Sequence, residues 1–178
     1  VCRDHTERML QGFAYPLERS SDGSRVCIEG GQRLKATEID VPSDISSATF
    51  FLVAAAITPG SELELEHVGV NPSRIGIINL LKLMGADIEM HNTREVGGEP
   101  VADLRIRYAP LTGIEIPQEQ IPLAIDEFPA LFVAAALAQG ETVLRGAEEL
   151  RVKESDRLAA MGAGLEAIGV SCEAYPDG

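Results

Sequence analysis

The 178-residue chain carries 28 acidic and 15 basic residues, and its net charge of −13 would repel nucleic acid and anionic membranes. An apolar content of 45% and a charged content of 24% are typical of a soluble globular protein, and no apolar stretch reaches membrane-spanning length. Cys2, Cys27 and Cys172 are widely spaced, which fits a reducing cytoplasm, and we expect all three to be packing residues. No cysteine or histidine spacing predicts a metal site.

The predicted elements follow a repeated order along the chain. Arg3–Leu10 and a short strand after Gly12 match the later part of a unit whose opening half is missing. One full βαβαββ unit comes next, with the loop of its last hairpin at Thr93–Pro100. Its apolar periodicities predict a strand at 34–40, a helix at 46–57, a strand at 61–67, a helix at 72–84 and strands at 87–91 and 101–108.

A second unit repeats the first eighty positions later, because Leu52–Ile57 (LVAAAI) matches Phe132–Leu137 (FVAAAL). It runs from about Gly113 to Tyr175, with a strand at 142–145, and lacks its last strand. The first helix of each unit is almost entirely apolar, which predicts burial on all sides, whereas the second helices are amphipathic and expected on the outside. A repeat that starts and stops within a unit predicts a central piece of a longer protein.

The string Arg151-Val-Lys-Glu-Ser-Asp-Arg-Leu158 places three cations within seven positions of an acidic chain. Apolar spacing predicts a helix from Glu154 or Ser155, with Lys153 and Arg157 on one face and Glu154 about a quarter-turn away. Cations at a helix N-terminus oppose the macrodipole unless an anion binds there. We therefore predict an anion site with an ionised Glu154; the alternative is a solvated first turn with local ion pairs.

Three further segments precede helices and could contribute to the same surface. Ser43–Ser47 and Asn71–Arg74 offer hydroxyls and a cation to a phosphate, and Asp126 in Ile125–Pro129 could act as a general base. Ordinary helix capping explains the serines and Asp126 equally simply, so both interpretations stay open.

In this order and spacing, the four motifs resemble the EPSP synthase (3-phosphoshikimate 1-carboxyvinyltransferase) family, in its glyphosate-tolerant bacterial class, over essentially the whole chain. The resemblance implies an α/β (α+β) fold, that of the EPT/RTPC-like enolpyruvyl transferases, with two globular domains of three βαβαββ units each. Residues 1–109 would then be part of the first domain and 110–178 part of the second, with a hinge near 109–117. The family transfers the enolpyruvyl group of phosphoenolpyruvate to the 5-hydroxyl of shikimate 3-phosphate in aromatic amino-acid biosynthesis, without metal or cofactor.

Carried over by position, the family's catalytic residues correspond to Asp126, Lys153 and Glu154. The resemblance implies that these three residues transfer protons and that Arg157 binds phosphoenolpyruvate. It also implies that Asp126 and Lys153 contact substrate. It further implies that Ser46, Ser47 and Arg74 bind the 3-phosphate of shikimate 3-phosphate. Ala48 stands where many members have a glutamine, and about half of the usual site is expected outside this chain.

Two other functions remain possible from the sequence. One is enolpyruvyl transfer to a UDP-sugar on the same fold, and the other is a non-catalytic piece whose exposed sheet edges and apolar helix faces favour self-association. In the leading interpretation the ligands are the two small anionic substrates, with no nucleic acid or membrane. The full-length protein is then expected to be a cytoplasmic monomer, and the isolated chain inactive.

Overall fold

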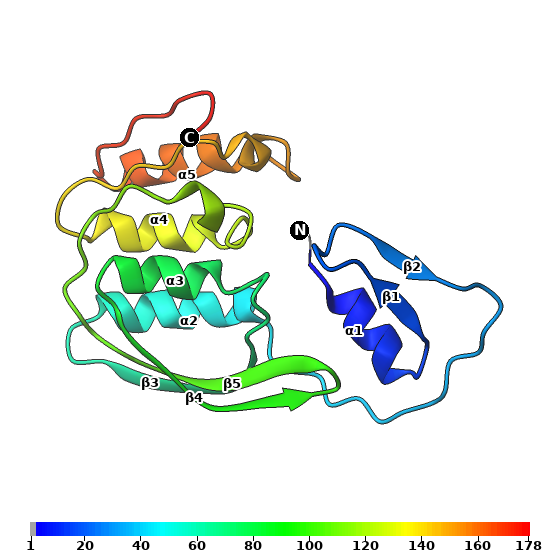
Figure 1. Cartoon of the computed structure of the whole chain (residues 1–178). Helices are drawn as coiled ribbons and strands as arrows, with labels where there is room; N and C mark the ends of the chain where they lie inside the picture. The colour runs from blue at the N-terminus through cyan, green and yellow to red at the C-terminus, as the bar shows by residue number, and fades with distance from the viewer. Residues whose placement is uncertain (1–2) are drawn as a thin grey trace.

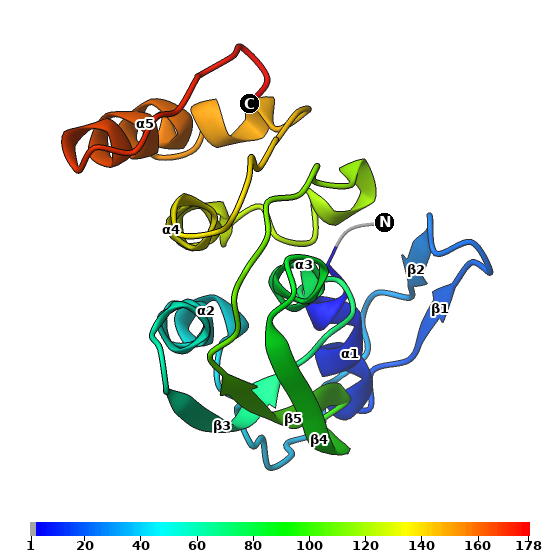
Figure 2. The same ribbon diagram turned by 90° about the vertical axis from the view of Figure 1, so that its left-hand side faces the viewer.

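The structure is a computed structural model that describes residues 3–178, so the packing predicted for Cys2 lies outside the described part. A three-stranded antiparallel sheet forms its base, with β5 (Glu99–Arg107) between β3 (Glu62–Gly69) and β4 (Asp87–Val96). Helices α2 (Ile45–Ile57) and α3 (Gly76–Leu83) cover one face of this sheet, α4 (Phe128–Ala136) lies over them, and α5 (Arg157–Ala167) lies over α4 (Figures 1 and 2). The layers are those of the predicted α/β class.

Strand β5 is the central and the most buried of the three strands. Val101, Ala102, Leu104 and Ile106 are fully buried, and both neighbouring strands pair with β5. The loop predicted at Thr93–Pro100 is wrong, because pairing continues to Val96 opposite Glu99. Gly97 and Gly98, at φ 59° and 85°, make the whole turn, since glycine adopts positive φ without strain.

Helix α2 confirms the predicted helix to within one residue, and the Asp44 side chain caps it by accepting the N–H of Ser47 at 3.1 Å. Burial on all sides is wrong, however, because Phe50 and Phe51 are 66% and 60% exposed. The helix packs on the sheet and on α4, and the side that carries the two phenylalanines is left open. In α4, Val133 is likewise partly exposed.

Helix α3 begins four residues later than predicted, because residues 72–75 form a turn. Its expected position on the outside is wrong: it packs against α4, β4 and the 3-10 helix η1 (Gln118–Gln120), and Ile77 and Leu80 are fully buried. Gly76 allows this, since a Cβ there would lie 2.5 Å from the backbone of Leu123. The expectation is confirmed for α5, where only Leu158 is buried.

The N-terminal part projects from the layered body as α1 (His5–Gly12) and a small hairpin of β1 (Leu17–Arg19) and β2 (Val26–Ile28) (Figure 1). Residues 32–42 form neither helix nor strand, so the strand predicted at 34–40 is wrong, and within the described residues no strand pairs with this segment. Its apolar side chains Leu34 and Ile39 are exposed. Cys27 on the hairpin is exposed too, so the packing predicted for it is wrong.

Residues 111–145 carry less regular structure than the repeat predicts. The strand predicted at 142–145 is reduced to a parallel bridge between Val143 and Glu115, and the 3-10 helix η2 (Glu148–Arg151) follows. One apolar core nevertheless runs from the sheet through α2 and α3 to Phe128, Leu131 and Leu150. The division into two globular domains near 109–117 stays a prediction.

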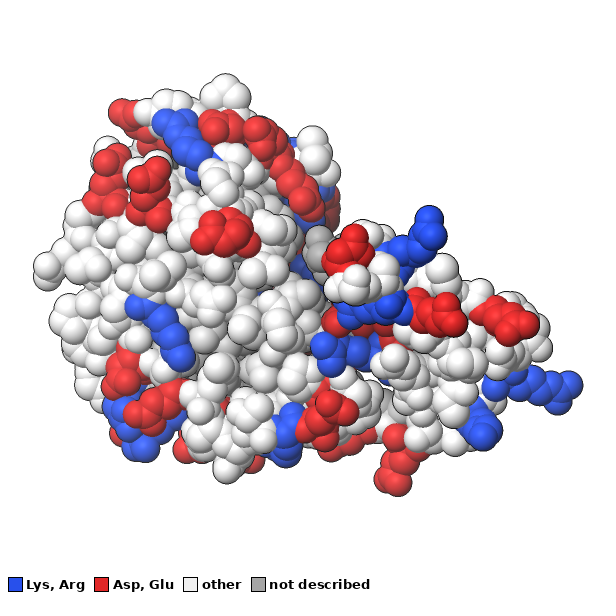
Figure 3. All heavy atoms as spheres, viewed as in Figure 1, with Lys and Arg blue, Asp and Glu red and all other residues white. Residues whose placement is uncertain are grey.

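Charged side chains leave much of one face uncovered. In the space-filling view they gather along the upper and lower margins of the body and on the projecting N-terminal part, and few lie over α2, α3 and α4 (Figure 3). Among the described residues, no helix is long and apolar enough to cross a membrane.

Candidate functional site

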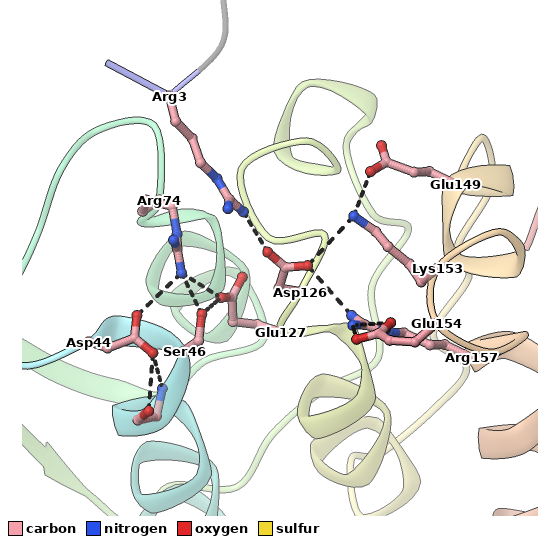
Figure 4. Close-up of polar contacts among 11 residues, drawn as sticks. Arg3, Asp44, Ser46, Arg74, Asp126, Glu127, Glu149, Lys153, Glu154 and Arg157 are labelled. Atoms are coloured by element: carbon pink, nitrogen blue, oxygen red, sulfur yellow. Dashed lines mark hydrogen bonds and ion pairs between the residues drawn. The ribbon is translucent and has the colours of Figure 1, made fainter. Parts of the chain in front are cut away.

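Asp126 is the centre of a cluster of charged residues contributed by three separate segments (Figure 4). It lies in the turn before α4. One carboxylate oxygen, Oδ2, is 2.6 Å from the guanidinium of Arg3, just ahead of α1. The other, Oδ1, is 3.7 Å from Nζ of Lys153 and 3.5 Å from Nη1 of Arg157, at the start of α5. Three cations therefore face one carboxylate.

These cations decide the protonation state of Asp126. Partial burial works to raise the pKa of its carboxyl, but the hydrogen bond from Arg3 and the charges of Arg3, Lys153 and Arg157 together hold that pKa below its ordinary value. The group is an anion at neutral pH. Lys153 and Arg157 also pair with Glu149 and Glu154, so a further anion bound by these cations would have to displace a carboxylate.

Lys153 and Glu154 lie ahead of α5 rather than in it. The helix begins at Arg157, because Asp156 caps it by accepting the N–H of Ala159 at 2.9 Å. The shared helix face predicted for Lys153 and Arg157 is therefore wrong, and the turn at 152–156 brings both to Asp126 instead. Lys153 also pairs with Glu149 at 2.6 Å, and this contact raises its pKa.

Glu154 is an exposed carboxylate that accepts two hydrogen bonds from Nη2 of Arg157, at 2.7 and 2.8 Å. That pairing lowers the pKa of Glu154, and so confirms the prediction that it is ionised at rest. The local ion pairs of the alternative interpretation are thus present. They coexist with the cluster around Asp126, because Arg157 contacts both acids.

Ser46, Ser47 and Arg74 form a neighbouring group that already holds carboxylates. Asp44 accepts hydrogen bonds from both the backbone N–H and the hydroxyl of Ser47, each at 3.1 Å, which is the capping interaction that sequence alone left open. The guanidinium of Arg74 lies 3.4 Å from Asp44, donates to the hydroxyl of Ser46 and lies 3.6 Å from Glu127.

Glu127 and Arg3 belong to the site although neither was predicted from the sequence. Glu127 has a side chain only 1% exposed and accepts a hydrogen bond from Ser46; burial raises its pKa. Its signal, a second acid beside Asp126, was present but was not used. Arg3 carried the signal that singled out Lys153, a cation ahead of a helix, and could have been found by the same argument.

The two groups border one open hollow of about 290 Å³ between the N-termini of α2 and α4. Ser46, Ser47, Asp126, Glu127 and Arg157 are among its lining residues. Four of the seven predicted site residues therefore line this hollow. Arg74, Lys153 and Glu154 do not line it, but they contact Ser46, Asp126 and Arg157 respectively. The described residues contain no group of three or more histidine, cysteine or acidic side chains that could hold a metal ion.

Comparison with known proteins places the chain among named relatives. The family model described as "EPSP synthase (3-phosphoshikimate 1-carboxyvinyltransferase)" matches residues 1–178. Proteins named 3-phosphoshikimate 1-carboxyvinyltransferase from Alkalilimnicola ehrlichii and Methylococcus capsulatus are each 66% identical over 176 residues, which is 99% of this chain and 39% and 40% of theirs.

A solved EPSP synthase structure from Acinetobacter baumannii is 55% identical, with a TM-score of 0.95; the match covers 100% of this chain and 40% of that one. The chain therefore spans about 40% of the length of the relatives it matches.

Proposed function

The chain belongs to the EPSP synthase family, and we propose that the full-length protein transfers the enolpyruvyl group of phosphoenolpyruvate to the 5-hydroxyl of shikimate 3-phosphate and releases phosphate. The observation that carries the proposal is the grouping of Arg3, Lys153 and Arg157 around Asp126. Both substrates are anionic, and in a chain of net charge −13 this cluster supplies the cations that could bind them, once its carboxylates are displaced.

In the proposed addition step, the ionised Asp126 takes the proton of the attacking hydroxyl as the new C–O bond forms at C2 of phosphoenolpyruvate. The methylene carbon C3 takes up a proton, which gives a tetrahedral intermediate. Lys153, whose ammonium faces Asp126, stabilises the charge that develops and exchanges protons there. Elimination removes one proton from the new methyl group and expels phosphate, so atoms and charges balance.

Glu154 is the proposed acid for C3 and the base for the later proton removal. At rest its bond to Arg157 keeps it ionised, so it cannot donate a proton in that state. An anionic phosphoenolpyruvate bound to Arg157 would draw the guanidinium away and bring negative charge near Glu154. Both changes raise the pKa of the carboxyl, so in this proposal binding of substrate itself prepares the acid.

Binding of the 3-phosphate by Ser46, Ser47 and Arg74 is the second part of the proposal. These groups are held by Asp44 and Glu127, so a phosphate would have to displace at least one carboxylate from Arg74. The proposal further comprises small-molecule substrates as the ligands and a cytoplasmic location.

The test is phosphate release by the purified full-length protein supplied with phosphoenolpyruvate and shikimate 3-phosphate. We expect turnover that Asp126→Asn, Lys153→Met and Glu154→Gln each reduce by about 100-fold or more, because general acid–base groups contribute roughly 100- to 10,000-fold. Glu119→Gln, at an exposed glutamate of η1, is the matched control. A folded wild type that releases no phosphate, or releases it only with a UDP-sugar acceptor, would contradict the proposal.

A further inference from the structure

We propose that Glu127 is a positioning residue, whose buried carboxyl fixes the direction of the Asp126 side chain toward its cations. Asp126 and Glu127 are consecutive, and their carboxyl groups lie near each other but contact different partners (Figure 4). Asp126 faces Arg3, Lys153 and Arg157, whereas Glu127 faces Ser46 and Arg74. Any rotation of this turn that released Glu127 would also move Asp126.

Glu127 fastens the start of α4 to two other helix starts. Ser46 lies in the first turn of α2, and its hydroxyl donates to Glu127. Arg74 lies in the turn before α3, with its guanidinium 3.6 Å from Glu127 and bonded to the same hydroxyl. Through one carboxyl group, the N-terminal ends of α2, α3 and α4 are held together.

Backbone hydrogen bonds of Glu127 link its side-chain contacts to the position of Asp126. The N–H of Glu127 donates to the carbonyl of Ala124 at 3.0 Å, and its own carbonyl accepts from Ala130 and Leu131 in the first turn of α4. Ile125 and Phe128 on either side are 5% and 0% exposed. Asp126 is thus the outward-facing member of a turn whose neighbours are fixed on both sides.

Stability alone gives little reason for an acid at this position. Its burial raises the pKa of Glu127, and the buried Oε2 atom has no hydrogen-bond partner in the described part of the chain. A buried charged or half-satisfied polar group is often no more stabilising than an apolar side chain of similar volume. Directing the neighbouring residue is a role that an apolar side chain could not perform.

The first experiment is a carbon-detected NMR titration of the Asp126 carboxyl in this chain and its variants. We expect a low pKa in the wild type and in Glu127→Gln, whose amide oxygen can still accept from Ser46 and still face Arg74. In Glu127→Ala we expect a higher pKa, because the loosened turn lets Asp126 leave its cations. Both variants remove the same charge, so a difference between them reports geometry. An equal pKa in the two would overturn the proposal.

Ser46→Ala provides a second route if Glu127→Ala does not fold. It removes one of the two anchors and should raise the Asp126 pKa in the same direction by a smaller amount. Glu119→Ala deletes an exposed glutamate and should leave the pKa unchanged. A Ser46→Ala pKa equal to that of the control would also count against a positioning role.

The second experiment rests on the proposed function and uses the full-length enzyme. A displacement of about 1 Å in a reacting group can cost about 100-fold in rate, so Glu127→Ala should lower kcat by roughly that factor while Glu127→Gln stays within about threefold of wild type. Equal loss in both variants would overturn the inference. An inactive wild type would contradict only the proposed function, since the titration of Asp126 needs no turnover.

Discussion

The carboxylate of Asp103 accepts the backbone N–H of His67 at 2.8 Å, and this bond joins the central strand β5 to an irregularity in β3. The same carboxylate accepts the side-chain amide of Asn92 at 2.9 Å, at a matching irregularity in β4. His67 and Asn92 have φ of 58° and 50°, in the left-handed region that non-glycine residues seldom adopt. One acid thus holds a bulge in each neighbouring strand.

Loss of the Asp103 charge should weaken the fold at neutral pH and not at acid pH. The hydrogen bonds from His67 and Asn92 lower the Asp103 pKa to about 2, whereas an unfolded aspartate titrates near 3.9. A lowered pKa stabilises the fold above about pH 4, and this contribution disappears as the pH falls toward 2. Urea midpoints of wild type and Asp103→Asn should therefore converge across that window. Glu95→Gln, on the exposed side of β4, is the control; parallel curves for Asp103→Asn would contradict the prediction.

Two helical glycines should respond oppositely to alanine. At Gly76 in α3, a Cβ would lie 2.5 Å and 2.7 Å from the backbone of Leu123 and Ala124, so Gly76→Ala should destabilise the protein by about 1–3 kcal/mol. A Cβ at Gly164 in α5 would have no atom within 4 Å beyond the neighbouring backbone of its own helix, so alanine should stabilise the protein by about 0.5–1 kcal/mol. Thermal unfolding of both variants tests the difference, and a change of the same sign at the two sites would refute it.

The attachment of the N-terminal part should depend on Asp4. This buried side chain accepts from Asn71 at 2.8 Å and from Arg19 at 3.2 Å, and lies 3.0 Å from Nε of Arg8, and its pKa is well below the ordinary range. Hydrogen bonds to charged groups contribute about 1.5–3 kcal/mol, so Asp4→Ala should speed amide exchange in α1 by roughly tenfold or more. Asp22→Ala, which disturbs only an exposed turn of the same hairpin, should leave α1 unchanged.

Alanine substitutions at Ser46 and Ser47 should distinguish binding of phosphate from helix capping and from positioning. If both bind the 3-phosphate, alanine at either position should raise the KM for shikimate 3-phosphate in the full-length enzyme by about tenfold, the effect of losing one hydrogen bond to a charged group. If Ser47 only supports the cap, Ser47→Ala keeps its N–H on Asp44 and changes KM little. Thr37→Ala, at an exposed residue of the N-terminal part, is a control. A rise confined to Ser46→Ala would contradict binding by the pair.

Local sequence patterns predicted much of the fold. The predictions failed where contacts between residues far apart in the sequence determine the structure. Helix α2 and strand β3 follow from apolar spacing alone. The segment at 34–40 has the composition of a strand, but a strand needs a hydrogen-bonded neighbour, which no local pattern supplies. The burial of α3 depends on the backbone at Leu123 packing against Gly76, almost fifty residues away.

In the candidate site, too, the sequence predicted the local features and not those that depend on distant contacts. The residue types at Asp126, Lys153 and Arg157 were readable from charges near helix starts, and their proximity followed from the repeat. Their geometry was not: α5 begins at Arg157 because Asp156 caps it, and Arg3 approaches from the other end of the chain. Glu127 was missed because a buried acid and an ordinary first-turn acid have the same sequence pattern.

The separate partners of Asp126 and Glu127 set a condition on the length of the turn that carries them. Removing or adding one residue between η1 and α4 would displace the two carboxyl groups relative to η1 or to α4, so that they could not both keep their partners. The identity of residues such as Leu123 can then vary more freely than their number. For protein engineering, this turn tolerates substitution in preference to insertion or deletion.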